Sequence, residues 1–258
     1  MPRPDRYLVG AVTVAVLMVA LVIGVGVAFA YDAGSSRRPP LAEATGIAPA
    51  VTDAGPVQPA TPDRPATAPD PYRPDDTWLA QLAGRTGIPL RALTAYARAH
   101  LRAAAEQPGC RVAWNSLAAI GGIESTHGSV HDSVLGEDGV ARPTILGPVL
   151  DGGAFGAVRD TDDGALDGDR AWDRAIGPLQ FIPSTWERWG ADGDGDGAAD
   201  PNQIDDAALA AARYLCHAGD LADPETWRRA IFSFNHSDAY VADIANLANV
   251  YASRAASS

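Results

Sequence analysis

Basic residues are scarce in this sequence. Lysine and arginine together number 20 among 258 residues, against 32 aspartates and glutamates, so the formal net charge is −12. A protein that binds nucleic acid needs a basic surface to neutralise phosphates, and this charge argues against such a partner. It does not argue against a glycan, which proteins bind by hydrogen bonds and apolar contact as well as by charge.

Cysteine is also scarce, and the five histidines lack the spacing of a metal site. The two cysteines, Cys110 and Cys216, permit one intramolecular disulfide, which we predict for an exported chain. The alternative is a pair of buried thiols that pack as small apolar side chains.

One long apolar run stands near the N-terminus, from Leu8 to Ala30, with Arg3 and Arg6 before it. A run of this length can span a bilayer, so residues 1–34 are predicted to be a signal anchor. The chain would then cross the cell membrane once, with the part after the anchor outside the cytoplasm. Residues 28–30 (Ala-Phe-Ala) also have the pattern of a cleavage site, so secretion after signal cleavage stays open.

The rest of the chain divides into a linker and one domain. Residues 35–74 are rich in proline and alanine and almost lack large apolar residues, which predicts a disordered linker. Residues 75–258 show amphipathic segments between polar loops, with no run of alternating strands and no repeat, so the predicted class is mainly α. Residues 127–170 show no sustained period and are expected to form a lid or groove wall. The predicted helices begin near residues 76, 89, 111, 183, 205, 224 and 237.

Glu124 stands out among the acidic residues because of its place on a predicted helix. At 3.6 residues per turn it continues the core-facing stripe of Trp114, Leu117 and Gly121. It also lies near the helix C-terminus, where the helix dipole disfavours negative charge. Both effects would raise the pKa of its carboxyl group, as a general acid at neutral pH requires. The alternative is that the helix end is frayed and that Glu124 reaches solvent, because the spacing would be the same.

Two further segments place polar side chains among apolar ones. Residues 177–186 read Gly-Pro-Leu-Gln-Phe-Ile-Pro-Ser-Thr-Trp, in which Gln180 could hydrogen-bond sugar hydroxyls or an N-acetyl group. Residues 234–237 read Phe-Asn-His-Ser, with Tyr240 one turn later. Taken alone, the first is also consistent with a capped loop, and the second with a helix-capping segment.

Together these segments resemble the lytic transglycosylases of bacterial peptidoglycan. Residues 123–125 (Ile-Glu-Ser), with Gly128 close behind, are similar to the catalytic helix end of that family. Residues 177–186 are similar to its glycan-groove motif, and residues 234–240 to its Tyr-Asn segment. The resemblance is to the membrane-bound lytic transglycosylase B type with an SLT domain, as found in exported actinobacterial proteins, and extends over residues 78–251. It implies a lysozyme-like (goose-type) fold and cleavage between N-acetylmuramic acid and N-acetylglucosamine with 1,6-anhydromuramyl ends.

The resemblance also implies roles for single residues, and no required cofactor. Glu124 would protonate the scissile oxygen and then act as base on the muramyl C6 hydroxyl, so that one carboxylate suffices. Phe234 departs from the family, which has tyrosine here, and any hydrogen bond from that hydroxyl is lost. The residues implied to bind, orient or line the path of the glycan are Ser125, Gln180, Phe181, Asn235 and Tyr240.

Residues 192–203 resemble an EF-hand loop. Position 12, where a bidentate glutamate is expected, is Gln203; Asp205 or Asp206 could replace it or cap the next helix. The predicted calcium ligands, at positions 1, 3, 5 and 9, are Asp192, Asp194, Asp196 and Asp200. The sequence therefore predicts a weak structural calcium site, or else an acidic turn without a ligand.

A second acidic loop contains five aspartates between residues 160 and 169. One of them could position a water, which would make the enzyme a hydrolytic muramidase, or the loop is merely solvated. Two non-enzymatic functions also stay open: a peptidoglycan-binding scaffold on the same fold, and a calcium-dependent adhesion module. The aspartates concerned are Asp160, Asp162, Asp163, Asp167 and Asp169.

Overall fold

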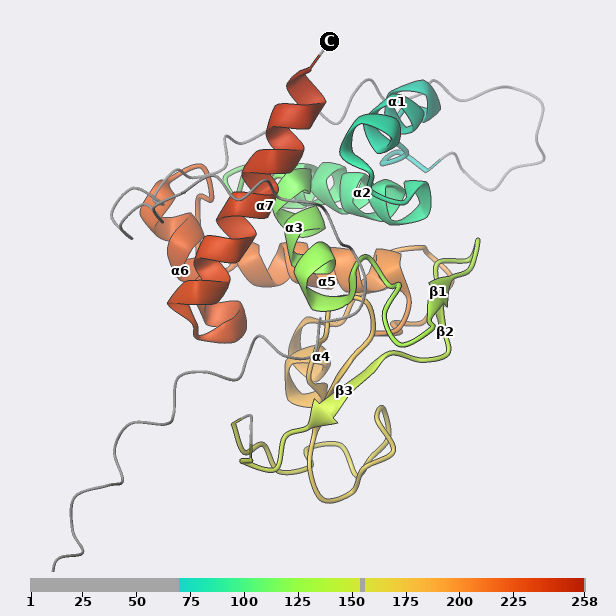
Figure 1. Cartoon of the computed structure of the whole chain (residues 1–258), viewed down its shortest axis with the longest axis vertical. Helices are drawn as coiled ribbons and strands as arrows, with labels where there is room; N and C mark the ends of the chain where they lie inside the picture. The colour runs from blue at the N-terminus through green and yellow to red at the C-terminus, as the bar shows by residue number, and fades with distance from the viewer. Residues whose placement is uncertain (1–69, 154–155, 258) are drawn as a thin grey trace, which may run out of the picture.

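The computed structural model describes residues 70–153 and 156–257 (Figure 1). The predicted signal anchor, residues 1–34, and residues 35–69 of the predicted linker lie outside this part of the chain. Within it, no helix combines the length and the apolar character needed to cross a membrane.

Helices dominate the described residues, which confirms the mainly α class. They are α1 (Asp76–Thr86), α2 (Leu90–Glu106), α3 (Trp114–Ser125), α4 (Pro183–Trp189), α5 (Ile204–Cys216), α6 (Pro224–Asn235) and α7 (Asp238–Ala256). The helix starts follow from local sequence, because the side chains of Asp75, Asp223 and Ser237 each accept a hydrogen bond from the backbone N–H three positions on.

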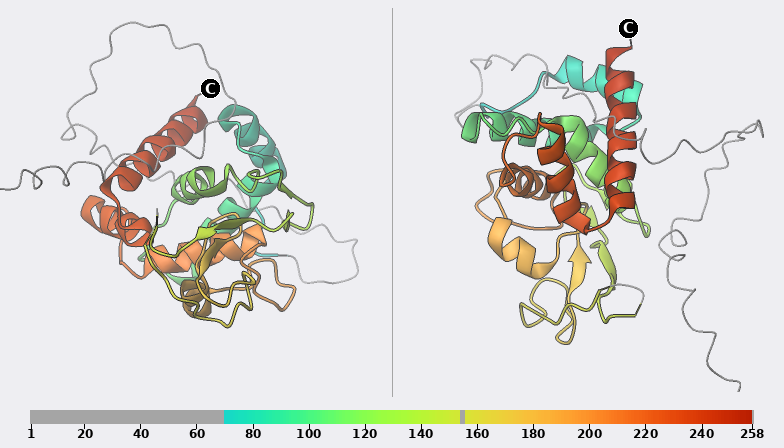
Figure 2. Two further views of the ribbon diagram at one scale, coloured as in Figure 1. Left: turned by 60° about the horizontal axis from the view of Figure 1, so that its bottom comes forward. Right: turned by 90° about the vertical axis from the view of Figure 1, so that its left-hand side faces the viewer.

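Short strands are present where the sequence indicated none. They are β1 (Val134–Leu135), β2 (Ala141–Arg142), β3 (Leu146–Val149) and β4 (Arg174–Ile176). β1 pairs with β2 and β3 with β4, both antiparallel. The expectation of a segment without regular structure over residues 127–170 is therefore wrong for β1, β2 and β3. Strands of two to four residues are too short to show an alternation of apolar and polar side chains in the sequence. β3 and its neighbouring turns lie apart from α1 and from the C-terminal end of α7 (Figures 1 and 2).

Helix α3 lies at the centre of the helical part. It packs against α2, α5 and α7, and α7 crosses it in Figure 1. Its side chains Trp114, Leu117 and Ile120 are fully buried. Because α3 is covered on several sides, the position of its C-terminal turn, which carries Glu124, is fixed by the core.

A disulfide joins Cys110, just before α3, to Cys216 at the end of α5, as predicted. The end of the predicted linker also lies against the helices. Asp70 forms an ion pair with Arg98 at 2.9 Å, and Pro74 is buried.

Candidate active site

Glu124 lies in the last turn of α3 and meets a side chain from α7. The Tyr240 hydroxyl donates a hydrogen bond to Glu124 Oε1 at 2.6 Å. Burial raises the pKa of the Glu124 carboxyl to about 7, and the hydrogen bond from Tyr240 opposes this rise. A carboxyl group with a pKa near neutrality can both donate and accept a proton at physiological pH.

The ring of Tyr240 is held against that of Phe234. The two rings stack with an interplanar angle of 2° and centroids 6.4 Å apart. Burial and the Glu124 carboxylate both raise the pKa of Tyr240 well above its usual value, so it stays a neutral donor. A neutral phenol hydroxyl therefore reaches Glu124 from Tyr240.

Ser125 connects the end of α3 to the loop that carries Gln180. Its hydroxyl donates to the Pro178 carbonyl at 2.6 Å and accepts from the Gly128 N–H at 2.8 Å. The residue is 2% exposed. With its hydroxyl bonded to two backbone groups, Ser125 joins the end of α3 to this loop.

Gln180 lies at the end of a tight turn between Ile176 and Phe181, which exchange two backbone hydrogen bonds of 2.8 and 3.0 Å. Its Nε2 donates to the Gly177 carbonyl at 2.9 Å. Gly177 has φ 76°, and a Cβ there would overlap the Pro201 carbonyl, so only glycine fits. The turn thus holds the half-buried Gln180 amide in one place.

The remaining two predicted glycan-binding residues differ in exposure. Phe181 is 2% exposed and packs edge-on against Trp186 and Phe234, so it belongs to the core that lies next to Tyr240's partner Phe234. Asn235 is exposed at the end of α6, on the connection that leads to Tyr240. These contacts therefore join Phe181 to Tyr240 through Phe234, and Ser125 to the loop of Gln180.

The acidic loop between α4 and α5 brings together three of the four predicted calcium ligands. Carboxylate oxygens of Asp192, Asp194 and Asp196 lie within 4.8 Å of one another. Burial, together with the charges of its neighbours, raises the pKa of the Asp194 carboxyl. Converging hard oxygen donors fit a calcium ion. Asp200 does not belong to this group, and its carboxylate accepts from the Asn202 N–H at 2.8 Å instead.

Gln203 has a role other than that of the missing glutamate. Its Oε1 caps α5 by accepting from the N–H groups of Asp205 and Asp206, at 2.5 and 2.9 Å. Its Nε2 donates to Asp194 Oδ2 at 2.9 Å. Asp206 is buried and accepts from the Gly193 N–H at 2.6 Å. These residues shape the loop from within, which leaves three converging carboxylates without a bidentate ligand.

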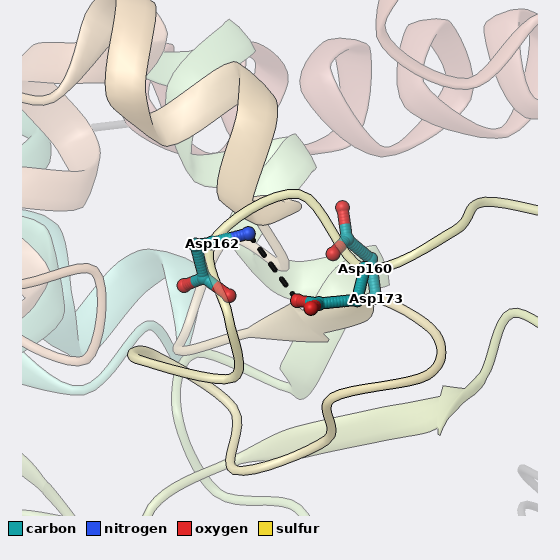
Figure 3. Close-up of side chains that lie close together, drawn as sticks. All are labelled: Asp160, Asp162 and Asp173. Carbon is teal, nitrogen blue, oxygen red and sulfur yellow. Dashed lines mark hydrogen bonds between the residues drawn. The ribbon is translucent and has the colours of Figure 1, made fainter.

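The second acidic cluster lies between β3 and β4 (Figure 3). Carboxylate oxygens of Asp160, Asp162 and Asp173 lie within 4.8 Å of one another. Asp173 is fully buried and accepts hydrogen bonds from the Thr161 N–H and hydroxyl at 2.9 and 2.8 Å. Asp160 accepts from the Asp162 N–H at 3.2 Å. These carboxylates order the turn, which favours a structural role for the loop.

Part of the chain, including some of the candidate site residues, is similar to a known protein family. Residues 158–229 match the family model of the transglycosylase SLT domain. The match supports an SLT-type lytic transglycosylase. It includes Gln180, Phe181 and the acidic loop that begins at Asp192, whereas Glu124 precedes it.

One solved structure similar to this chain is SltB3 from Pseudomonas aeruginosa in complex with NAG-anhNAM-pentapeptide. The two are 21% identical, with 69% of this chain and 67% of the other covered and a TM-score of 0.38. Curated proteins give no match.

Two features of the site were not predicted from the sequence. The hydrogen bond between Tyr240 and Glu124 joins residues 116 positions apart, and no local pattern links them. His127 received no role because it lacks metal-site spacing, yet it is buried between Tyr96 and Tyr251. Its position three residues after Glu124 was the available signal.

Proposed function

We propose that the chain is a peptidoglycan lytic transglycosylase with Glu124 as both acid and base. The observation that carries the proposal is a carboxyl group with a pKa of about 7, held by Tyr240 at the end of the central helix. The SLT-domain match supports the same reaction class.

In the proposed reaction, the protonated Glu124 donates its proton to the glycosidic oxygen between N-acetylmuramic acid and N-acetylglucosamine, and the bond from C1 to that oxygen breaks. The C6 hydroxyl of the same muramyl residue attacks C1 and gives its proton to the Glu124 carboxylate. The products are a 1,6-anhydromuramyl end and a free glucosaminyl hydroxyl. No water is consumed and Glu124 regains its proton, so the second carboxylate of ordinary glycosidases is not needed. Gln180 and Asn235 would hydrogen-bond the glycan.

The test is mass spectrometry of purified peptidoglycan digested by residues 70–258. Anhydromuramyl ends are the expected products. Reducing muramyl ends would instead identify a hydrolytic muramidase, and would direct attention to the loop around Asp160. Glycan binding without any cleavage would identify a scaffold.

We propose further that the domain acts outside the cytoplasm, anchored by residues 1–34 and tethered by residues 35–74. The disulfide between Cys110 and Cys216 supports an oxidising compartment. Mass spectrometry of the mature N-terminus, after membrane and medium fractions are separated, distinguishes the intact anchor from a cleaved signal.

Replacing Tyr240 by phenylalanine should move the pH dependence of the reaction to higher pH. The hydrogen bond from Tyr240 lowers the pKa of Glu124, so its loss should raise that pKa above about 7. Because the acid form starts the reaction, the fall of kcat on the alkaline side should occur at higher pH than in the wild type. Tyr214→Phe, whose hydroxyl bonds to the Ser233 carbonyl, is the control. An unchanged profile in Tyr240→Phe would contradict the assignment.

Calcium should stabilise the domain through the loop at residues 192–196. At a concentration ten times the dissociation constant, the ion would contribute about 1.4 kcal/mol and raise Tm by about 3–6 °C. Chelation should reverse this, and Asp196→Asn should abolish it, whereas Asp200→Asn should preserve it because Asp200 lies outside the group. Equal loss in both variants would contradict the three-carboxylate site. Wall cleavage that survives chelation while wall binding is lost would favour an adhesion module.

A further inference from the structure

The chain leaves α3 through a strained turn directly after Glu124. Thr126, His127 and Gly128 have φ values of 51°, 60° and 83°, so three successive residues adopt the left-handed region. For a β-branched residue such as threonine this conformation is rare, and it costs about 1–2 kcal/mol per residue. Such a turn persists only where its surroundings hold it.

Helices α2 and α7 hold this turn through hydrogen bonds to His127. Its side chain is buried, with Nδ1 at 3.1 Å from the Tyr96 hydroxyl of α2 and Nε2 at 2.9 Å from the Tyr251 hydroxyl of α7. Burial lowers the pKa of His127 to about 4, so the ring is neutral at physiological pH. A neutral imidazole has one donor and one acceptor, so one tyrosine donates to it and the other accepts from it.

The same two tyrosines touch the last turn of α3 itself. A Cβ at Gly121 would overlap the Tyr96 hydroxyl, and a Cβ at Gly122 would lie 3.2 Å from the Tyr251 hydroxyl. The His127 N–H donates to the Gly121 carbonyl at 2.8 Å. Tyr96 and Tyr251 therefore hold α3 one turn before Glu124, and His127 holds the chain three residues after it.

We propose that His127, clamped by Tyr96 and Tyr251, is a positioning residue that keeps the Glu124 carboxyl directed at Tyr240 and the glycan. The inference rests on the proposed function, since it concerns the same carboxyl group. It differs from plain core packing because the clamp closes on the two sides of Glu124 and on the strained turn at Thr126.

The test is His127→Phe, which keeps a ring of similar size and removes both hydrogen bonds. A small displacement of a reacting group can cost about a hundredfold in rate, so kcat is expected to fall by about 10- to 100-fold with little change in KM. A Glu124 carboxyl released from its buried position should also titrate at lower pH, which moves the alkaline fall of kcat to lower pH. Tyr251→Phe removes one bond and should show both effects more weakly.

His100→Phe is the matched control. His100 is equally buried, and its ring bonds to the Val112 carbonyl at 2.7 Å, before α3 begins. It should lose stability comparable to that of His127→Phe but keep the wild-type pH profile and the wild-type kcat per folded molecule. If His127→Phe behaves like His100→Phe, the positioning role is overturned.

A second readout does not depend on catalysis. In protein labelled at the glutamate side-chain carboxyl carbon, the carbon-13 titration of Glu124 should shift between the wild type and His127→Phe. If His127→Phe does not fold, the titration in Tyr251→Phe decides the question. If the wild type cleaves no glycan but the titration of Glu124 differs between the two proteins, the proposed function is wrong and the positioning role stands. If the wild type cleaves glycan and the titration does not differ, the proposed function stands and the positioning role is wrong.

Discussion

Replacing Glu124 by glutamine should abolish the release of anhydromuramyl products. General acid–base catalysis typically contributes about 10²–10⁴-fold, and Glu124 is proposed to perform both proton transfers. We therefore expect kcat to fall by at least about 10³-fold. Glutamine fills the same space and cannot exchange a proton, so the loss would report chemistry rather than packing. The measurement is the mass-spectrometric product yield at equal concentrations of folded protein.

The same substitution should leave the fold intact and make it less sensitive to pH. The pKa of Glu124 is raised from 4.5 to about 7 in the folded protein. Its protonated form therefore contributes stability that is fully present below about pH 4.5 and is lost as the pH rises through 7. The variant lacks this titration, so its Tm should fall less than that of the wild type between pH 5 and pH 8.

Glu225→Gln is the control, because Glu225 is exposed in the first turn of α6. It should retain full activity. Activity in Glu124→Gln above a tenth of the wild-type value would mean that another group carries the proton.

Removing the disulfide by the double substitution Cys110→Ser and Cys216→Ser should cause a large loss of stability. The bond closes a loop with a sequence separation of 106. Constraining so long a loop in the unfolded chain is worth about 2–5 kcal/mol. For a domain of this size each kcal/mol corresponds to about 2–4 °C, so Tm should fall by on the order of 10 °C.

The measurement is calorimetry, with reduced wild-type protein as the comparison. The reduced wild type and the double variant should unfold at similar temperatures. Cys110 precedes α3, whereas Glu124 lies at its far end, about 15 Å along the helix axis, so activity at 25 °C should persist in the fraction that stays folded. An unchanged Tm would show that the bond does not form in the protein.

The helices could be predicted because their signals are local. Asp75, Asp223 and Ser237 are good caps, and they stand where apolar periodicity begins. In α3 the residues from Trp114 to Gly121 are all buried, so the helix has no single buried stripe. The expected rise in the pKa of the Glu124 carboxyl is nevertheless present, because burial raises it. The strands could not be predicted, since a pair of two-residue strands exists only through its partner across a turn.

The contacts of the candidate site residues could not be predicted from local sequence patterns. Ser125 resembles a glycan-binding residue in sequence, yet its hydroxyl reaches the Pro178 carbonyl 53 positions away. Asp200 fits the EF-hand spacing, but its carboxylate turns to its own backbone at Asn202. The partner of Ser125 lies in a distant segment, which no local pattern reveals. The bond of Asp200 is local, but the spacing of an EF-hand loop does not show that the carboxylate makes it.

The bond from Ser125 to Pro178 also couples the two segments that carry Glu124 and Gln180. It ties the end of α3 to the turn of Gln180, so the Glu124 carboxyl and the Gln180 amide lie on segments that are joined to each other. The end of α6 is joined to the same turn by ring packing, because Phe234 contacts Phe181 with ring centroids 5.7 Å apart. Glu124 and Gln180 are thus connected along two routes, one through Ser125 and one through Tyr240 and Phe234. A change in the spacing of the two residues would have to disturb both routes.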